Sequence, residues 1–214
     1  MIKNAFEAVI FDLDGVITKT ATTHSQAWKK MFDDYLLDRS EKNKETFNEF
    51  TPDDYLTFVD GKPRYEGVKS FLDSRNIDLP FGSPEDSTDL ETVCGLGNRK
   101  NKTFNEVLKN EGVEVYPSTV NLLDQLKKDN IRIGVASSSK NAEAVLKAAG
   151  LSHYIETRVD GVVSAEIGLK GKPAPDIFLT AAHNLGVDIN KSIVVEDAVS
   201  GVQAGKNGNF GLVL

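Results

Sequence analysis

Two carboxylates follow an apolar run close to the start of the chain. Residues 8–11 read Ala-Val-Ile-Phe, which is typical of a buried strand, and Asp12 and Asp14 come directly after them. Side chains at alternate positions of a strand point to the same side, and open α/β sheets bind ligands beyond the carboxyl ends of their strands. One carboxylate at such an edge can attack a phosphorus atom while the other moves a proton. Taken alone, the pattern is equally that of an ordinary acidic turn.

A second apolar run ends in hydroxyl side chains. Residues 131–136 read as a strand, and Ser137 and Ser138 follow. Their hydroxyl groups, together with the amides of the following turn, can donate hydrogen bonds to the oxygens of a phosphoryl group. Serines in this position elsewhere often serve only to cap a helix.

A third apolar run ends in two more acids. Residues 192–195 are followed by Glu196 and Asp197, and Lys172 precedes a Pro-Ala-Pro sequence between the second and third runs. An isolated acidic pair is more often a solvated helix start than a ligand pair, and an isolated lysine is usually an exposed loop residue. A shared position at one edge of the sheet favours a functional site instead, because carboxylates there can hold a hard cation and the lysine can neutralise phosphate charge.

In this order, the four groups resemble the core motifs of the haloacid dehalogenase superfamily, specifically its β-phosphoglucomutase-like branch. The match covers essentially the whole chain. The resemblance implies an α/β fold, namely a Rossmann-like doubly wound parallel sheet with an inserted α-helical cap domain. It also implies an enzyme that transfers a phosphoryl group of a sugar phosphate through an aspartyl phosphate, with Mg²⁺ as cofactor.

The resemblance assigns a role to each core residue. Asp12 is the nucleophile, and Asp14 is the general acid and base. Ser137 and Lys172 hold the transferring phosphoryl group, and Ser138 contributes to substrate binding through its backbone amide. The implied Mg²⁺ ligands are Asp12, the backbone carbonyl of Asp14, Glu196 and Asp197.

Three residues of the predicted cap match substrate-binding positions of the branch. His24 follows Asp12 by twelve residues and is placed to bond Asp14. Arg64 matches an arginine that grips the distal phosphate, a task that suits a guanidinium because it can bond in a bidentate manner. Lys100 matches a lysine that faces the site. Outside the family context His24 would be a structural polar residue, and Arg64 and Lys100 would be solvated surface charges.

Two departures from the branch put the exact sugar in doubt. Lys19 stands at a hinge position that commonly holds aspartate, and Asp60 stands where the mutase pattern prefers lysine. A carboxylate there repels a sugar phosphate unless Lys62 takes over. The cap also contains extra residues around 79–92.

Composition narrows the class of protein. The chain has 214 residues, 40% hydrophobic and 27% charged, with a formal net charge of −7, which argues against a nucleic-acid partner. No apolar run approaches the roughly 20 residues that span a membrane, and no basic segment followed by an apolar stretch marks a signal peptide. The single cysteine, Cys94, allows no internal disulfide. We expect a cytoplasmic monomer that binds a small sugar phosphate and no membrane.

The order of predicted elements locates the two domains. Regular alternation of strands and helices begins only after Val115, with helices expected at 118–128, 141–149 and 175–185 and with Ser118 and Asn141 as N-caps. Helical patterns without strands occupy the region before it, around 22–37, 53–58, 67–74 and 99–109. We therefore predict a core of residues 1–19 and 113–214 and a cap of residues 20–112. An apolar run at 210–214 predicts a further core strand, after which members of the branch usually continue with another strand and helix.

Three functions remain open from the sequence. The first is an isomerase that converts glucose 1-phosphate to glucose 6-phosphate, favoured by His24, Arg64 and Lys100. The second is a hydrolase of the same fold that releases phosphate from a sugar phosphate, favoured by Asp60. The third is a sugar-phosphate sensor with a relict site, against which every catalytic position is filled.

Overall fold

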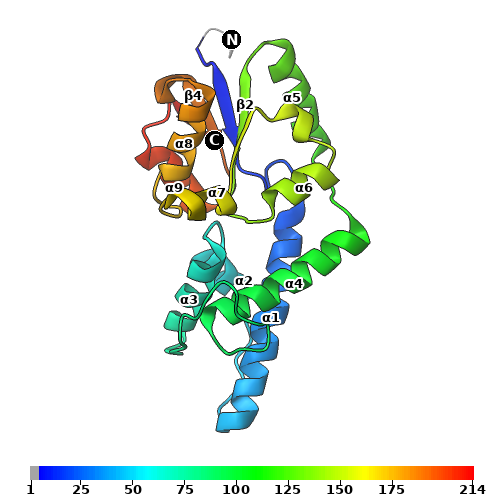
Figure 1. The fold of residues 1–214 in the computed structure, drawn as a ribbon, viewed down its shortest axis with the longest axis vertical. Helices are drawn as coiled ribbons and strands as arrows, with labels where there is room; N and C mark the ends of the chain where they lie inside the picture. Colours follow the sequence, from blue (N-terminus) through cyan, green and yellow to red (C-terminus); the bar gives the residue numbers. More distant parts are fainter. Residues whose placement is uncertain (1–4) are drawn as a thin grey trace. The chain divides into compact units, whose positions relative to one another are not determined.

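The computed structural model describes residues 5–214, and the chain divides into two compact units. The core unit comprises the residues up to Thr20 together with 61–63 and 112–214, and the cap unit comprises 21–60 and 64–111 (Figure 1). Residues 61–63, which lie inside the predicted insert 20–112, thus group with the core unit.

Within the described residues, the core unit is built on five parallel strands in the order β3-β2-β1-β4-β5. The central strand is β1, whose Phe11 pairs with Val135 on one side and with Val195 on the other. The residues that follow β1, β2 and β4 therefore emerge at one edge of the sheet. The strands are β1 (Ala8–Phe11), β2 (Arg132–Ala136), β3 (Thr157–Val159), β4 (Ser192–Val195) and β5 (Leu212–Val213).

Helices cover both faces of this sheet, with α5 on one side and α8 on the other (Figure 1). The β1 side chains are all buried, as expected for a parallel strand covered on two faces. Ile10 of β1, Phe178 of α8 and Val194 of β4 belong to one apolar cluster. The predicted doubly wound α/β class is confirmed. The helices of this unit are α5 (Pro117–Lys128), α6 (Ala142–Ala148), α7 (Gly161–Ile167), α8 (Asp176–Leu185) and α9 (Val199–Asn207), with single turns at Ser152–Tyr154 and Ile189–Lys191.

Of the two predicted helix N-caps, Asn141 is confirmed and Ser118 is not. The N-cap of α5 is Tyr116, in extended conformation, because Pro117 occupies the first helical position, where its fixed φ angle favours a helix start. The prediction of Ser118 as the cap was therefore wrong by two residues. Asn141 is the N-cap of α6, but its side chain makes no capping hydrogen bond. The backbone amide of Asn141 donates to Ser139 Oγ at 3.1 Å.

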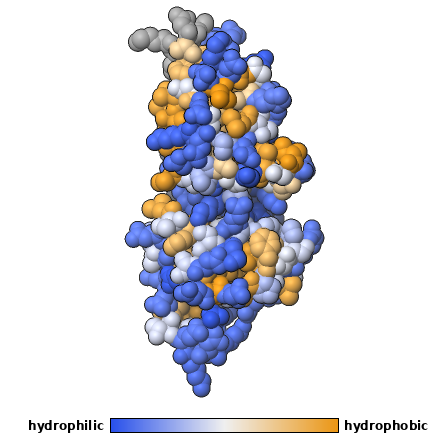
Figure 2. All heavy atoms as spheres, turned by 90° about the vertical axis from the view of Figure 1, so that its left-hand side faces the viewer, coloured by the Kyte–Doolittle hydropathy of each residue, from blue (hydrophilic) through white to orange (hydrophobic). Residues whose placement is uncertain are grey.

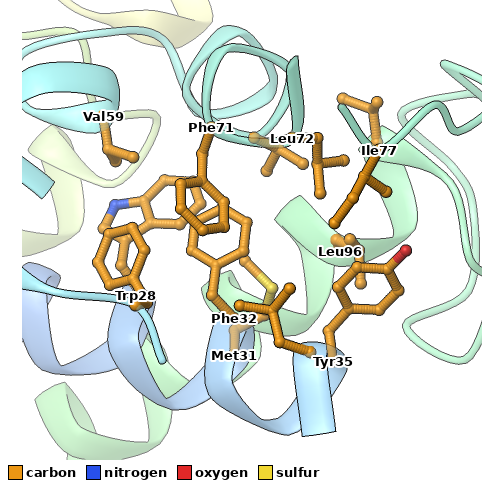
Figure 3. Packing of buried hydrophobic residues seen from close by; sticks show 13 residues of the cluster. Trp28, Met31, Phe32, Tyr35, Val59, Phe71, Leu72, Ile77 and Leu96 are labelled. Atoms are coloured by element: carbon orange, nitrogen blue, oxygen red, sulfur yellow. The ribbon is translucent and has the colours of Figure 1, made fainter. Parts of the chain in front are cut away.

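The cap unit is helical throughout its regular part and has its own core. Aromatic residues recur at helical spacing on α1, and Phe32 lies 4.2 Å from Phe71 of α3, measured between ring centroids (Figure 3). The ring centroid of Phe50 lies 4.9 Å from that of Phe32. Trp28 stacks on Phe32 at 5.5 Å. The elements are α1 (Thr20–Asn43), α2 (Pro52–Asp54), a π-helical turn (Tyr55–Val59), α3 (Arg64–Ser74) and α4 (Val93–Glu111).

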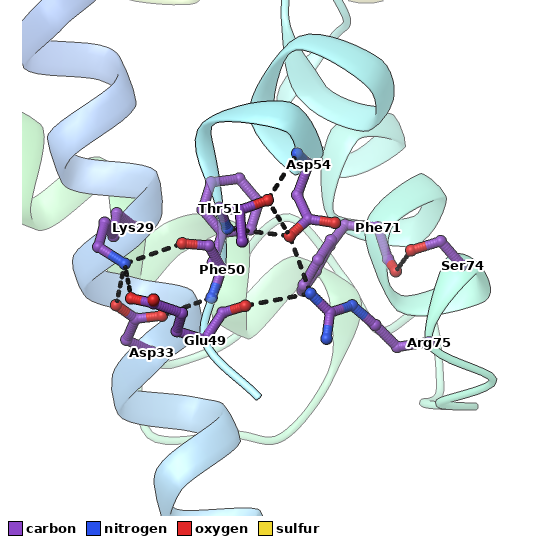
Figure 4. Close-up of polar contacts among 9 residues, drawn as sticks. All are labelled: Lys29, Asp33, Glu49, Phe50, Thr51, Asp54, Phe71, Ser74 and Arg75. Carbon is purple, nitrogen blue, oxygen red and sulfur yellow. Dashed lines mark hydrogen bonds and ion pairs between the residues drawn. The ribbon is translucent and has the colours of Figure 1, made fainter. Parts of the chain in front are cut away.

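A polar network fixes the segment that joins α1 to α2. Thr51 caps α2 by accepting from the Asp54 amide, and the Asp54 carboxylate accepts from the Thr51 amide in return (Figure 4). Arg75 Nη2 then donates to Asp54 Oδ2 at 2.8 Å and to the Glu49 carbonyl at 3.1 Å. The end of α3 is thereby joined to the start of α2.

Hydrophilic side chains cover much of the face drawn in Figure 2. On the face drawn in Figure 2, hydrophilic side chains gather at the lower end, where Figure 1 shows the end of α1. Apolar side chains reach the surface in small groups elsewhere on that face. None of the helices in residues 5–214 combines the length and the apolar character that crossing a membrane requires.

Candidate active site

The site forms where three neighbouring strands end. Asp12 follows β1, Ser137 follows β2 and Glu196 follows β4. The Asp12 amide still donates to the Val195 carbonyl at 2.9 Å, so the first carboxylate leaves the sheet in register with β4. The adjacency expected from the sequence is thus produced by the strand order.

A buried ion-pair cluster occupies this edge. Lys172 Nζ lies 2.6 Å from Asp12 Oδ1 and 2.6 Å from Glu196 Oε2. All three residues are buried. One cation therefore bridges two carboxylates that would otherwise repel each other.

The electrostatics of the cluster follow from burial and proximity. Burial raises the pKa of Asp12 well above its ordinary value, and the nearby charge of Glu196 adds to the rise while Lys172 opposes it. Burial alone would lower the pKa of Lys172, but Asp12 and Glu196 raise it above the usual range. The lysine is held as a cation, and the cluster as a whole has an excess of acidic groups.

The loop that carries Lys172 is held at several points. The Asn207 side chain donates to the Pro173 carbonyl at 2.9 Å, and the Lys170 amide donates to Asp176 Oδ2 at 3.1 Å. Within the loop, the Ala174 amide donates to the Gly171 carbonyl at 2.9 Å. These bonds link the lysine to α8 and α9, which themselves pack against the sheet.

The second carboxylate is oriented by hydroxyl groups. The Asp14 amide donates to Asp12 Oδ2 at 2.9 Å, and Thr20 Oγ1 donates to Asp14 Oδ1 through a short hydrogen bond. Thr18 Oγ1 lies 2.6 Å from Thr20 Oγ1 and also reaches the Leu13 carbonyl at 3.1 Å. Sequence analysis did not single out Thr20, because a threonine six residues after a carboxylate carries no chemical signal of its own.

Three carboxylates of the edge have the arrangement of a cation site. Oxygens of Asp12, Glu196 and Asp197 all lie within 4.8 Å of one another. The Asp197 carboxylate occupies the space that a Cβ atom on Gly15 would fill, and Gly15 has a positive φ of 95°. Only glycine adopts that conformation without strain and leaves this space open. Hard oxygen donors of this kind suit Mg²⁺ or a similar ion.

The serines after β2 are placed differently from each other. Ser137 is buried, and its Oγ accepts from the Ser139 amide at 3.1 Å. Ser138 Oγ donates to the Gly61 carbonyl at 2.8 Å, so its hydroxyl binds another segment of the core unit. In the role that the family resemblance implies, Ser138 would bind substrate through its backbone amide.

The cap residues singled out from the sequence form two clusters inside the cap unit. Lys100 Nζ lies 2.5 Å from His24 Nδ1, and the lysine is buried with its Nζ 5.0 Å from the ring centroids of Trp28 and Phe104. His24 stacks on Phe104 with 4.0 Å between centroids. Arg64, at the start of α3, forms a separate cluster.

Comparison with known proteins assigns the family. The model of the haloacid dehalogenase-like hydrolases matches residues 6–209. The chain belongs to this family. A β-phosphoglucomutase of Mycobacterium tuberculosis is 49% identical over 208 residues, which cover 97% of this chain and 79% of the relative. The fructose-1-phosphate phosphatase YqaB of Escherichia coli is 30% identical over 205 residues, covering 94% and 92%. A crystal structure of β-phosphoglucomutase from Clostridium difficile superimposes with a TM-score of 0.76 at 30% identity, covering 97% and 83%.

These likenesses make the chain a haloacid dehalogenase-type phosphotransferase of the β-phosphoglucomutase-like or sugar-phosphatase kind. The predicted family and enzyme class are confirmed. The arrangement at the sheet edge suits that chemistry, because it presents a carboxylate oxygen next to a fixed cation and a second carboxylate two residues further along the chain.

Proposed function

We propose that this enzyme is a Mg²⁺-dependent β-phosphoglucomutase-like isomerase that converts glucose 1-phosphate to glucose 6-phosphate. The observation that carries the proposal is the Asp12 carboxylate at the end of β1, paired with Lys172 and close to Glu196 and Asp197. The identity of 49% to a protein named β-phosphoglucomutase supports the choice of reaction. We further expect the enzyme to act as a monomer in the cytoplasm.

The proposed chemistry has two covalent steps. An Asp12 carboxylate oxygen attacks the 1-phosphate of glucose 1,6-bisphosphate, forming an aspartyl phosphate as the bond to the sugar oxygen breaks and glucose 6-phosphate is released. Asp14 gives its proton to that leaving oxygen. In the return step Asp14 takes the proton of the attacking 6-hydroxyl of glucose 1-phosphate, and the phosphoryl group passes from Asp12 to that oxygen, which regenerates the bisphosphate. Thr20 holds the Asp14 carboxylate through its short hydrogen bond.

The remaining core residues supply charge and hydrogen bonds. Lys172 stays against Asp12 and offers its positive charge to the phosphoryl oxygens, while Ser137 and the Ser138 amide donate hydrogen bonds to them. A Mg²⁺ ion, held by Asp12, Glu196, Asp197 and the Asp14 carbonyl, would supply the positive charge that phosphate and carboxylates together require.

The cap is proposed to hold the rest of the substrate. Arg64 would bind the distal phosphate, and Lys100 with His24 would face the sugar. In support of this, no carboxylate lies within ion-pair distance of Arg64 among residues 5–214, so its charge has no acidic partner there.

A sugar-phosphate phosphatase is the second candidate. The E. coli relative named fructose-1-phosphate phosphatase is 30% identical over 94% of this chain, and Asp60 stands where the mutase pattern prefers lysine. In that case water takes the phosphoryl group from Asp12 in the return step.

One incubation separates the two candidates. The protein is mixed with β-glucose 1-phosphate, Mg²⁺ and catalytic glucose 1,6-bisphosphate, and glucose 6-phosphate and free phosphate are followed together, with a chelator in a parallel sample. The isomerase predicts glucose 6-phosphate in large excess over free phosphate, and no product with the chelator. Stoichiometric release of free phosphate from this or another sugar phosphate identifies a phosphatase. Absence of Mg²⁺-dependent product in every case favours the sensor.

A further inference from the structure

The Arg64 guanidinium is held by a neutral side chain. Its Nη2 donates to Asn101 Oδ1 of α4 at 2.8 Å. Arginine can only donate, so the oxygen of the Asn101 amide must face it. The guanidinium has no carboxylate at ion-pair distance in the described part of the chain, and burial lowers the pKa of Arg64.

The stem of Arg64 is fixed as well. A Cβ atom on Gly97 would lie 2.7 Å and 2.9 Å from ring carbons of Tyr65 and 3.3 Å from Arg64 Cδ. The absence of a side chain at Gly97 therefore lets both residues lie directly on α4. Asn101 is one helical turn further along the same helix, where it meets the end of the arginine.

The neighbouring Tyr65 is anchored to the extra segment of the cap. Tyr65 Oη donates to Asn98 Oδ1 at 2.9 Å, and Asn98 Nδ2 donates to the carbonyls of Pro84 at 3.0 Å and Asp86 at 2.9 Å. Within that segment, Thr92 Oγ1 donates a hydrogen bond to Asp86 Oδ2 at 2.6 Å. Residues 79–92 thus support Tyr65, which lies next to Arg64 on the surface of α4.

Holding the Arg64 guanidinium against a neutral amide costs free energy unless an anionic ligand binds the guanidinium. A guanidinium that leaves water and meets only a neutral acceptor keeps an uncompensated charge. A carboxylate in the place of Asn101 would neutralise that charge. Asparagine and aspartate have nearly the same shape, so the difference between them at this position is charge. An oriented but uncompensated guanidinium is what capture of an external anion requires.

We propose that Asn101 is a positioning residue that directs Arg64 toward the distal phosphate of a sugar bisphosphate while leaving its charge available. This inference rests on the proposed function, since it assumes that the substrate carries a second phosphate. It explains why residue 101 on α4 is neutral. A carboxylate at this position would favour stability and weaken phosphate binding, whereas Asn101 does the opposite.

The test compares Asn101→Asp with Asn101→Ala in a chain made inactive by Asp12→Asn. Binding of glucose 1,6-bisphosphate and of fructose 1,6-bisphosphate is measured by calorimetry, and thermal unfolding is measured alongside. Asn105→Asp, which adds the same charge at an exposed position one turn further along α4, is the matched control. We expect Asn101→Asp to keep or raise the melting temperature and to weaken bisphosphate binding by about tenfold or more, with a smaller loss for Asn101→Ala.

The outcomes separate this inference from the proposed reaction. Binding of the fructose compound alone, lost in Asn101→Asp, overturns the glucose substrate and supports the role of Asn101. Equal affinities in Asn101→Asp and the Asn105→Asp control overturn the role of Asn101 even if the isomerase activity stands. A lower melting temperature with a loss of affinity that Asn101→Ala reproduces in full means that Asn101 is merely structural. Binding of neither compound by the parent chain overturns both proposals.

Discussion

At Asp12, both carboxylate oxygens have a donor. Oδ1 accepts from Lys172 at 2.6 Å, and Oδ2 accepts from the Asp14 amide at 2.9 Å. In the proposed reaction, a carboxylate held on both sides has a fixed direction of attack, so less rotational freedom is lost in reaching the transition state. The same contacts would place the lysine where phosphoryl charge develops.

Replacing Asp12 tests the covalent step. We expect Asp12→Asn to reduce turnover by at least about a thousandfold, because an amide is a poor nucleophile and the change also removes a charge from the cation site. Turnover at saturating sugar phosphate is the measurement, and Asp188→Asn, at an exposed position, is the control. A rate within tenfold of the parent would rule out Asp12 as the nucleophile.

Replacing Asp14 tests the division of labour. We expect Asp14→Ala to lose sugar-phosphate turnover but still to form a phosphorylated Asp12 slowly from acetyl phosphate, whose leaving group needs little protonation. Mass spectrometry of the protein after incubation with acetyl phosphate and Mg²⁺ detects the added phosphoryl group. A folded Asp14→Ala protein that is never labelled would show that Asp14 is needed for the attack itself.

The site residues differ in how far the sequence could reveal them. Asp12, Ser137 and Glu196 each end an apolar run, so the parallel sheet alone predicts that they meet. Thr20 and Asn101 had no such signal. Their contacts depend on how a helix start or a helix face packs, which spacing along one chain does not specify.

At the scale of elements, apolar periodicity was a reliable guide where the elements are long. It located α1 and α4, although α4 begins at Val93, six residues before the predicted start at 99. It missed β3 and α7, because β3 has only three residues and α7 buries none of its side chains. Short edge strands and exposed helices lack the pattern on which such predictions depend.

The cap of α2 offers a stability test with a definite pH dependence. Partial burial would raise the pKa of Asp54, but hydrogen bonds from Thr51 and the pairing with Arg75 outweigh it, so this pKa is lowered in the folded chain (Figure 4). A lowered folded-state pKa means that ionised Asp54 stabilises the fold above its unfolded-state pKa of about 3.9, and that this stabilisation disappears as the pH falls through the folded value.

We therefore expect Asp54→Asn to lower the free energy of unfolding by about 1–2 kcal/mol near neutral pH, because charge-assisted hydrogen bonds become neutral ones. Urea unfolding of both proteins from about pH 7 to about pH 3 measures the difference, which should shrink toward the acidic end, where the native aspartate is protonated as well. Asp53→Asn, on the exposed side of the same turn, is the control. A difference that does not vary with pH would show that the ionised form of Asp54 contributes nothing beyond its shape.

At the scale of the whole molecule, the two units carry different sets of charged side chains. The core unit has the Asp12 carboxylate paired with a fixed lysine, and a cluster of carboxylates suited to a cation. The cap unit has an arginine without an acidic partner in the described chain and a buried lysine next to His24. In the proposed reaction, a small phosphoryl donor needs only the core residues, whereas a sugar that carries two phosphates would use both sets.

Replacing Arg64 tests whether the cap unit binds a second phosphate. We expect Arg64→Ala to depress sugar-phosphate isomerisation by about 30-fold or more, because losing a charge-assisted pair in a desolvated site costs about 2–5 kcal/mol. Hydrolysis of acetyl phosphate should hardly change, since this donor has no second phosphate for the arginine to bind. Both rates are measured on the same preparations, with Arg39→Ala, which removes another cap arginine paired with Glu45, as the control. Equal losses in both reactions would mean that Arg64 supports the fold of the cap, and unchanged rates in both would put the phosphatase ahead of the isomerase.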